Sequence, residues 1–217
     1  MFKSVHNGWG LWRHMATAWN DAATNAQKLT VYAAASITGG SWKVMLEKAI
    51  SEFNALAKKN SINVILEKSK DPPKDDGSGA DINVEAAAGS ITPSWAGKSS
   101  SSMVFSGIRL HGHTTQFKQE GKIQKAFVYL PSTPKINTPK ALRAAGEGVL
   151  KVIAVHELVH ACGLEDGDHT TDDLFQGYPD VDYGSTASGD RVLIPGGSMP
   201  PLKFGGTTIQ KLKGIWP

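Results

Sequence analysis

The chain has 217 residues, of which 40% are hydrophobic and 20% charged, and its formal net charge is +3 at pH 7. This length allows one substantial domain with a buried core, or at most two small domains. The basic residues are scattered and no apolar run approaches the length of a membrane span, so we expect neither a nucleic-acid partner nor a membrane-spanning segment.

The N-terminal part predicts a short helix, because apolar residues recur there at helical spacing (Trp12, Met15, Ala16 and Trp19). We expect residues 1–27 to form an extension that packs on one domain made of residues 28–217, since no linker divides the rest of the chain. The first residues lack the apolar core and cleavage site of a secretory signal. Unless a leader has been removed, we expect a cytoplasmic protein or one exported by a non-classical route.

Hydrophobic periodicity and turn residues predict a mixture of strands and helices in the rest of the chain. In order, these are a strand at 28–36, a helix at 42–59, strands at 62–68 and 80–87, a polar segment at 89–102, a long strand at 103–117, a strand at 124–131, a helix from about 137 to 163, a glycine- and proline-rich segment at 164–201, and a short helix at 207–216. The pattern favours an α+β domain.

The second long helix contains the sequence His156-Glu157-x-x-His160. Residues four apart lie on one face of a helix, so both imidazoles can bind the same ion at Zn–N distances of roughly 2.0–2.1 Å. Glu157 projects beside them and can reach a metal-bound water as a general base. The flanking residues are apolar, and burying these three side chains is costly unless a metal satisfies them. The alternative is a pair of core histidines with an ion-paired glutamate.

A third ligand must come from beyond this helix. Gly163 allows the chain to leave the helix through a left-handed turn, which would bring the following residues under the metal. The residues His156, Glu157, His160 and Gly163 together resemble the metzincin metallopeptidases, whose pattern is HExxHxxGxxH followed by a methionine turn. The resemblance implies a metzincin-like (zincin-like) catalytic domain: a mixed twisted sheet and the motif helix above a loop-rich lower half that ends in a helix.

The sequence departs from the metzincin pattern at the third histidine. Asp166 stands three residues after Gly163, and His169 follows three residues later. Asp166 would be the ligand if the chain resembles the small bacterial metzincins that use aspartate here. Alternatively, a turn at residues 166–167 lengthens the loop and His169 binds the metal. We favour His169, because neutral imidazole is the commoner and more selective zinc ligand, and we keep Asp166 as the alternative third ligand.

The resemblance also implies a methionine beneath the metal. Met199, between Ser198 and Pro200, matches such a methionine turn, unless it is an ordinary loop methionine. Its implied role is structural, as an apolar floor under the ligand histidines. The residues that follow, Pro200, Pro201 and Leu202, would line the pocket for a substrate side chain.

Other candidate ligands carry less weight. His111 and His113 flank a glycine in a predicted strand and share one face, but without further ligands nearby we expect surface residues rather than a second, structural zinc. The aspartates of residues 166–190 do not match the spaced pattern of a calcium loop, so calcium is not supported. Cys162 is the single cysteine, which excludes an intramolecular disulfide.

These observations predict a zinc-dependent endopeptidase with one catalytic Zn²⁺. Glu157 would take a proton from metal-activated water and pass it to the leaving amine. We expect a monomer that binds an extended polypeptide along a strand edge, which we place at residues 103–110. The alternatives are a zinc hydrolase of another amide bond, or a non-catalytic structural or binding protein in which the metal only staples the fold. Glu157 argues against the staple, because a purely structural site does not need it.

Overall fold

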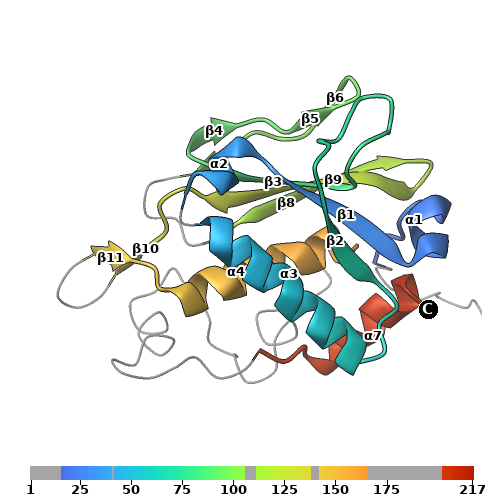
Figure 1. Cartoon of the computed structure of the whole chain (residues 1–217). Helices are drawn as coiled ribbons and strands as arrows, with labels where there is room; N and C mark the ends of the chain where they lie inside the picture. The colour runs from blue at the N-terminus through green and yellow to red at the C-terminus, as the bar shows by residue number, and fades with distance from the viewer. Residues whose placement is uncertain (1–15, 41, 106–110, 138–141, 166–201) are drawn as a thin grey trace, which may run out of the picture.

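A five-stranded mixed sheet with the strand order β2-β1-β3-β9-β8 runs through the middle of the molecule (Figure 1). The computed structural model describes residues 16–40, 42–105, 111–137, 142–165 and 202–217. Neighbours among β2, β1, β3 and β9 pair parallel, whereas the edge strand β8 pairs antiparallel with β9. The strands are β1 (Lys28–Ala33), β2 (Ile65–Ser69), β3 (Ile82–Ala87), β8 (His113–Gln119) and β9 (Lys122–Pro131).

The two long helices cover one face of this sheet. Figure 1 shows α3 (Trp42–Lys59) and α4 (Glu147–Ala161) packed together below the strands, with α7 (Gly206–Ile215) near the C-terminal end of α4. The helix α3 buries one face, as its amphipathic pattern predicts, whereas α4 is apolar on most sides and is buried almost throughout. None of the helices in the described ranges is long and apolar enough to cross a membrane.

The opposite face of the sheet carries short elements. The strand β4 (Gly89–Ile91) pairs with β7 (Met103–Phe105), and β5 (Ser94–Trp95) pairs with β6 (Lys98–Ser99). A small apolar cluster of Ala87, Phe105 and Tyr129 lies on this face, separate from the main core. The remaining elements are α1 (Asp21–Ala26), α2 (Ala35–Thr38), β10 (Lys135–Asn137) and β11 (Leu142–Ala144).

Successive residues of β8 alternate between the two faces of the sheet. Thr114 and Gln116 lie opposite Val128 and Ala126, which belong to the main core under the helices. Their neighbours His113 and Thr115 lie opposite residues of the small cluster on the other face. Directly opposed residues share a face of a sheet, so Thr114 and Gln116 face α4.

Most of the predicted elements are confirmed, and α3 has the predicted bounds. The long strand predicted at 103–117 is wrong, because β7 and β8 belong to different sheets. The segment 89–102, for which the sequence predicted only a polar segment, contains the short strands β4, β5 and β6. These strands are brief hairpin partners, whose pairing depends on contacts outside each strand.

Two helix predictions also change. The helix predicted from about residue 137 begins at Glu147, because residues 142–144 instead pair with β10 in a two-stranded sheet. Where the structure describes the helix predicted around Trp19, it shows extended chain: Trp19 forms a parallel bridge to Ile123, and α1 begins only after the cap Asn20. Trp19 is 1% exposed, so burial of its large side chain overrides the local helical spacing.

Candidate metal and catalytic site

The motif lies in the last turns of α4, where the helix passes under β8. Glu157 and His160 are buried, at 4% and 5% exposed, and His156 is partly buried. The Nε2 atoms of His156 and His160 are 3.1 Å apart, and their ring planes meet at 53°. The structure therefore brings the predicted pair of ligand histidines together, with the same ring nitrogen of each turned toward the other.

The tautomer of His160 follows from its other ring nitrogen. His160 Nδ1 lies 2.9 Å from the carbonyl oxygen of Leu164, and a carbonyl can only accept, so Nδ1 carries the proton. In the neutral ring this leaves a lone pair on Nε2. Histidines that bind metals commonly donate their second N–H to a carbonyl or carboxylate in this way, which fixes the ring orientation.

The two imidazoles fit a zinc ion in both spacing and chemistry. Two nitrogens bound tetrahedrally at about 2.0–2.1 Å would lie roughly 3.3 Å apart, close to the observed 3.1 Å. The same distance also fits an Nε2–H···Nε2 hydrogen bond between the rings without a metal. Within the described residues, no group of three or more His, Cys, Asp or Glu side chains is arranged to hold an ion.

The predicted third ligands His169 and Asp166 lie outside the described residues, as do Met199, Pro200 and Pro201 of the predicted methionine turn and substrate pocket. Leu202 is described and is 3% exposed in the main hydrophobic core. His111 is exposed, and His113, the first residue of β8, is partly buried.

Glu157 is held against β8. The hydroxyl of Thr114 lies 2.7 Å from Glu157 Oε2 and 3.1 Å from the Glu157 carbonyl oxygen. Gly112 lies against the same side chain: a Cβ placed on it would be 2.5 Å from Glu157 Cγ and 2.8 Å from both Cδ and Oε1. The predicted general base thus lies in a tight site between its own helix and the strand that ends the sheet.

The carbonyl groups that close α4 all accept hydrogen bonds. The His160 carbonyl accepts from Gly163 N and from Gln116 Nε2, and Gln116 also donates to Leu164 O. The intervening carbonyls accept hydrogen bonds from distant parts of the chain. Trp19 Nε1 donates to Ala161 O at 2.9 Å, Trp216 Nε1 donates to Cys162 O at 2.9 Å, and Thr17 N donates to Gly163 O at 3.0 Å. The last carbonyls of a helix have no partner within it, so these donors remove a buried cost.

Gly163 ends the helix through the left-handed turn that its position predicts, with φ of +121°. A Cβ at this position would lie 2.5 Å from the backbone oxygen of Thr17 and 2.8 Å from Ile215 Cδ1. Glycine is therefore required both by the backbone conformation and by the space between residues 16–19 and α7.

Cys162 occupies the position that caps α4 and is fully buried. Burial raises the pKa of its thiol far above the ordinary value, because a thiolate would lose its hydration there. The group is a neutral core thiol, and a thiol buried in apolar surroundings is inert.

A polar pocket of about 370 Å³ opens beside His160, between the end of α4 and β8. Its walls include His113, Thr114 and Gln116 of β8, together with Leu164 beyond the helix. Lys118 and Glu165 also line it and form an ion pair with each other. The strand beside this pocket is β8, whereas β7, which covers residues 103–105 of the predicted substrate edge, pairs with β4 on the other face of the sheet. The rest of that predicted edge, residues 106–110, lies outside the described residues.

Several residues of the site carry no sequence signal of their own. Thr114 and Gln116 alternate along β8, and Gly112 directly precedes the strand, but their partners lie more than forty residues away on α4. Trp19 and Trp216 look like ordinary core residues until their indole N–H groups are seen to bond the end of α4. For Thr114 and Gln116, the only sequence signal is their spacing of two residues, which places both side chains on one face of a strand.

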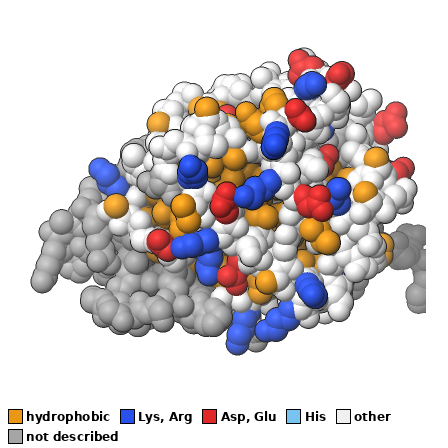
Figure 2. All heavy atoms as spheres, in the orientation of Figure 1, with side chains coloured by type: hydrophobic (Ala, Val, Ile, Leu, Met, Phe, Trp, Pro, Cys, Tyr) orange, Lys and Arg blue, Asp and Glu red, His pale blue; other side chains and the backbone are white. Residues whose placement is uncertain are grey.

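On the face of the described molecule that Figure 2 shows, positively and negatively charged side chains are intermixed.

Comparison with protein-family models gives no match, and no curated protein matches the sequence.

Proposed function

We propose that this protein is a zinc-dependent endopeptidase of the metzincin type. The observation that carries the proposal is the 3.1 Å distance between the Nε2 atoms of His156 and His160 on one helix. Glu157, which follows His156 in the sequence, is buried next to them. The hydrogen bond from His160 Nδ1 to Leu164 O supports it, because it turns a lone pair toward the shared position.

The arrangement of elements agrees with the resemblance. A mixed sheet with an antiparallel edge strand lies above the motif helix, and a C-terminal helix closes the chain. The positive φ of Gly163 is what the HExxHxxG pattern requires of its glycine. These features are compatible with a metzincin-like domain.

His156 and His160 would hold the metal, with His169, or alternatively Asp166, as the third ligand. Zinc bound there would supply a water of lowered pKa and polarise the scissile carbonyl. Glu157 would accept a proton from a water molecule as the water oxygen adds to the carbonyl carbon. The same carboxyl would then give the proton to the amide nitrogen as the C–N bond breaks, which would release a carboxylic acid and an amine.

The substrate of this proposal is an extended polypeptide. In the part of the chain that the structure describes, β8 ends the sheet, and it runs beside both the pocket and Glu157. A peptide added along this edge would satisfy backbone donors and acceptors as a further strand does. We therefore move the proposed substrate edge from residues 103–110 to β8.

The decisive experiment compares two isosteric variants on the same helix. Glu157→Gln should retain about one zinc per chain but lose peptide hydrolysis by about 10²-fold or more, since general acid–base catalysis contributes that much. Glu147→Gln is the matched control, because Glu147 lies in the first turn of α4 and pairs with the exposed Lys48. Zinc is measured by elemental analysis and hydrolysis with a fluorogenic peptide library.

Three results separate the alternatives. A protein without zinc, or a Glu157→Gln variant as active as the parent, contradicts the enzyme proposal. Zinc with turnover of small amides but of no peptide identifies a hydrolase of another amide bond. Zinc without any turnover, together with unfolding when His156→Ala removes the metal, indicates a structural staple.

A further inference from the structure

We propose that Gly112 and Thr114 form a seat for the Glu157 carboxylate and act as positioning residues for the reaction. The proposal rests on the proposed function, in which Glu157 is the general base. It adds that the base is aimed by the edge strand and not by its own helix alone. We call Gly112 and Thr114 together the carboxylate seat.

The first contact of the carboxylate seat is a hydrogen bond. Thr114 Oγ1 is 2.7 Å from Glu157 Oε2, the short range expected when a hydroxyl donates to a carboxylate. The hydroxyl has one proton and two acceptors within reach, and the Glu157 carbonyl is the more distant at 3.1 Å. The carboxylate is therefore the favoured acceptor, and the bond fixes the rotation of the carboxyl group.

The second contact is steric. The missing side chain of Gly112 leaves the space in which Glu157 Cγ and Cδ lie, 2.5 and 2.8 Å from where a Cβ would be. Gly112 has no positive φ, so its backbone does not demand glycine. What demands glycine is the Glu157 side chain, which would have to turn away from any larger residue.

Both contacts come from β8 and the residue just before it: Thr114 lies on the helix-facing side of the strand, and Gly112 immediately precedes it. Gly112 and Thr114 are two residues apart, and Gln116, two further on, bonds the carbonyls of His160 and Leu164. One strand face thus positions the base and the helix end that bears a ligand histidine. In the proposed function the same strand pairs with the substrate, so the distance from base to scissile carbonyl is set by a single rigid element.

The hydroxyl is tested with a matched pair of threonines. Thr114→Val should retain zinc and KM but lower kcat about 10- to 100-fold, and Thr114→Ser should restore kcat to within about threefold. Thr30→Val is the control, because Thr30 Oγ1 also lies 2.7 Å from a carboxylate oxygen, that of Asp81, in the distant part of the sheet. An unchanged kcat in Thr114→Val, or an equal loss in Thr30→Val, overturns the proposal.

The steric contact is tested with a pair of glycines. Gly112→Ala should keep zinc and lower kcat by at least as much as Thr114→Val, because the methyl group displaces the Glu157 side chain. Gly146→Ala is the control, since a Cβ there meets nothing within 4 Å. A Gly112→Ala enzyme with the kcat of the parent would contradict the steric half of the seat.

A stability measurement that needs no activity separates this proposal from the proposed function. A double-mutant cycle with Thr114→Val and Glu157→Ala should show a coupling of about tenfold or more in the unfolding constant, since hydrogen bonds to charged groups are strong. If the protein hydrolyses no peptide but the coupling is present, the proposed function fails and the contact stands. A coupling below about twofold overturns the carboxylate seat whether or not the protein is an enzyme.

Discussion

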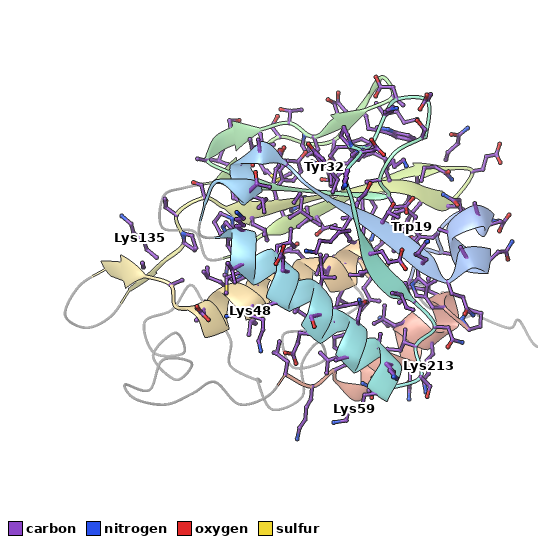
Figure 3. All side chains as sticks on the ribbon, viewed as in Figure 1. Trp19, Tyr32, Lys48, Lys59, Lys135 and Lys213 are labelled. Atoms are coloured by element: carbon purple, nitrogen blue, oxygen red, sulfur yellow. The ribbon has the colours of Figure 1, made fainter. Side chains whose placement is uncertain are left out.

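The two ends of α4 are built differently. At the N-terminal end the cap is Gly146, which has no side chain to bond the first turn, and Glu147 forms an exposed pair with Lys48 at 2.8 Å. Figure 3 labels Lys48 on α3 near this end. At the C-terminal end every carbonyl of residues 160–164 accepts a hydrogen bond, several of them from distant segments.

The difference shows where precision is needed. An exposed ion pair contributes little, about 0–1 kcal/mol, and an uncapped first turn can fray without harm. The motif residues lie at the other end, where a small shift of the helix would separate two ring nitrogens now 3.1 Å apart. Donors from residues 16–19, from β8 and from Trp216, the residue that follows α7, hold that end in place.

Gly163→Ala should produce the largest loss of stability. Alanine at φ +121° is strained, and its Cβ would lie 2.5 Å from the Thr17 carbonyl oxygen. We expect a loss of about 3 kcal/mol or more in the free energy of unfolding, measured by urea titration. Gly146→Ala, at the open end of the same helix, should change it by less than about 1 kcal/mol. Equal losses at the two glycines would refute the contrast between the ends.

Trp216→Phe should cost less but affect the site. The substitution removes the donor to the buried Cys162 carbonyl, which is expected to cost about 1–3 kcal/mol. Trp42→Phe is the matched control, because its indole donates to Pro131 O at 2.8 Å and it is equally buried. Zinc affinity, measured by competition with a chelator, should fall about tenfold only in Trp216→Phe. The same affinity in both variants would mean that the helix end does not position the ligands.

Cys162 makes the stability of the same end depend on pH. The folded protein raises the pKa of the thiol above 9.0, so the folded state retains a proton that the unfolded chain loses. The thiol's contribution is therefore complete below about pH 9 and falls above it, by about 1.4 kcal/mol per pH unit. Subtracting the profile of Cys162→Ala from that of the parent isolates this term. A flat difference between pH 8 and 10.5 would contradict the burial of the thiol.

Gly146→Ser should give the smallest effect, and in the opposite direction. A serine at the cap can accept a hydrogen bond from the first turn of α4, which glycine cannot, so we expect a gain of a few tenths of a kcal/mol, roughly 0.3. Differential scanning calorimetry would detect it as a slightly higher Tm. Hydrolysis and zinc content should not change, because the site is at the other end. A loss of activity here would show that the two ends are coupled.

The sequence alone predicted what depends on local patterns. The amphipathic face of α3, the strands β1, β3 and β9, and the helix bearing His156, Glu157 and His160 all follow from periodicity. The start of α4 was predicted too early because residues 142–144 pair with β10, and a partner strand cannot be read from a single segment.

The spacing of His156 and His160 by itself determined that two imidazoles share one helix face, since a helix repeats every 3.6 residues. Only the tertiary structure decided how that face is aimed. Thr114 and Gln116 bond Glu157 and the His160 carbonyl, while Trp19 and Trp216 bond the carbonyls at the end of the helix, all from elements far away in the chain. Such contacts depend on how strands and helices pack against one another. The residue pattern within one segment does not encode this packing, because a buried hydrogen-bonding group pairs with whichever partner the packing brings near.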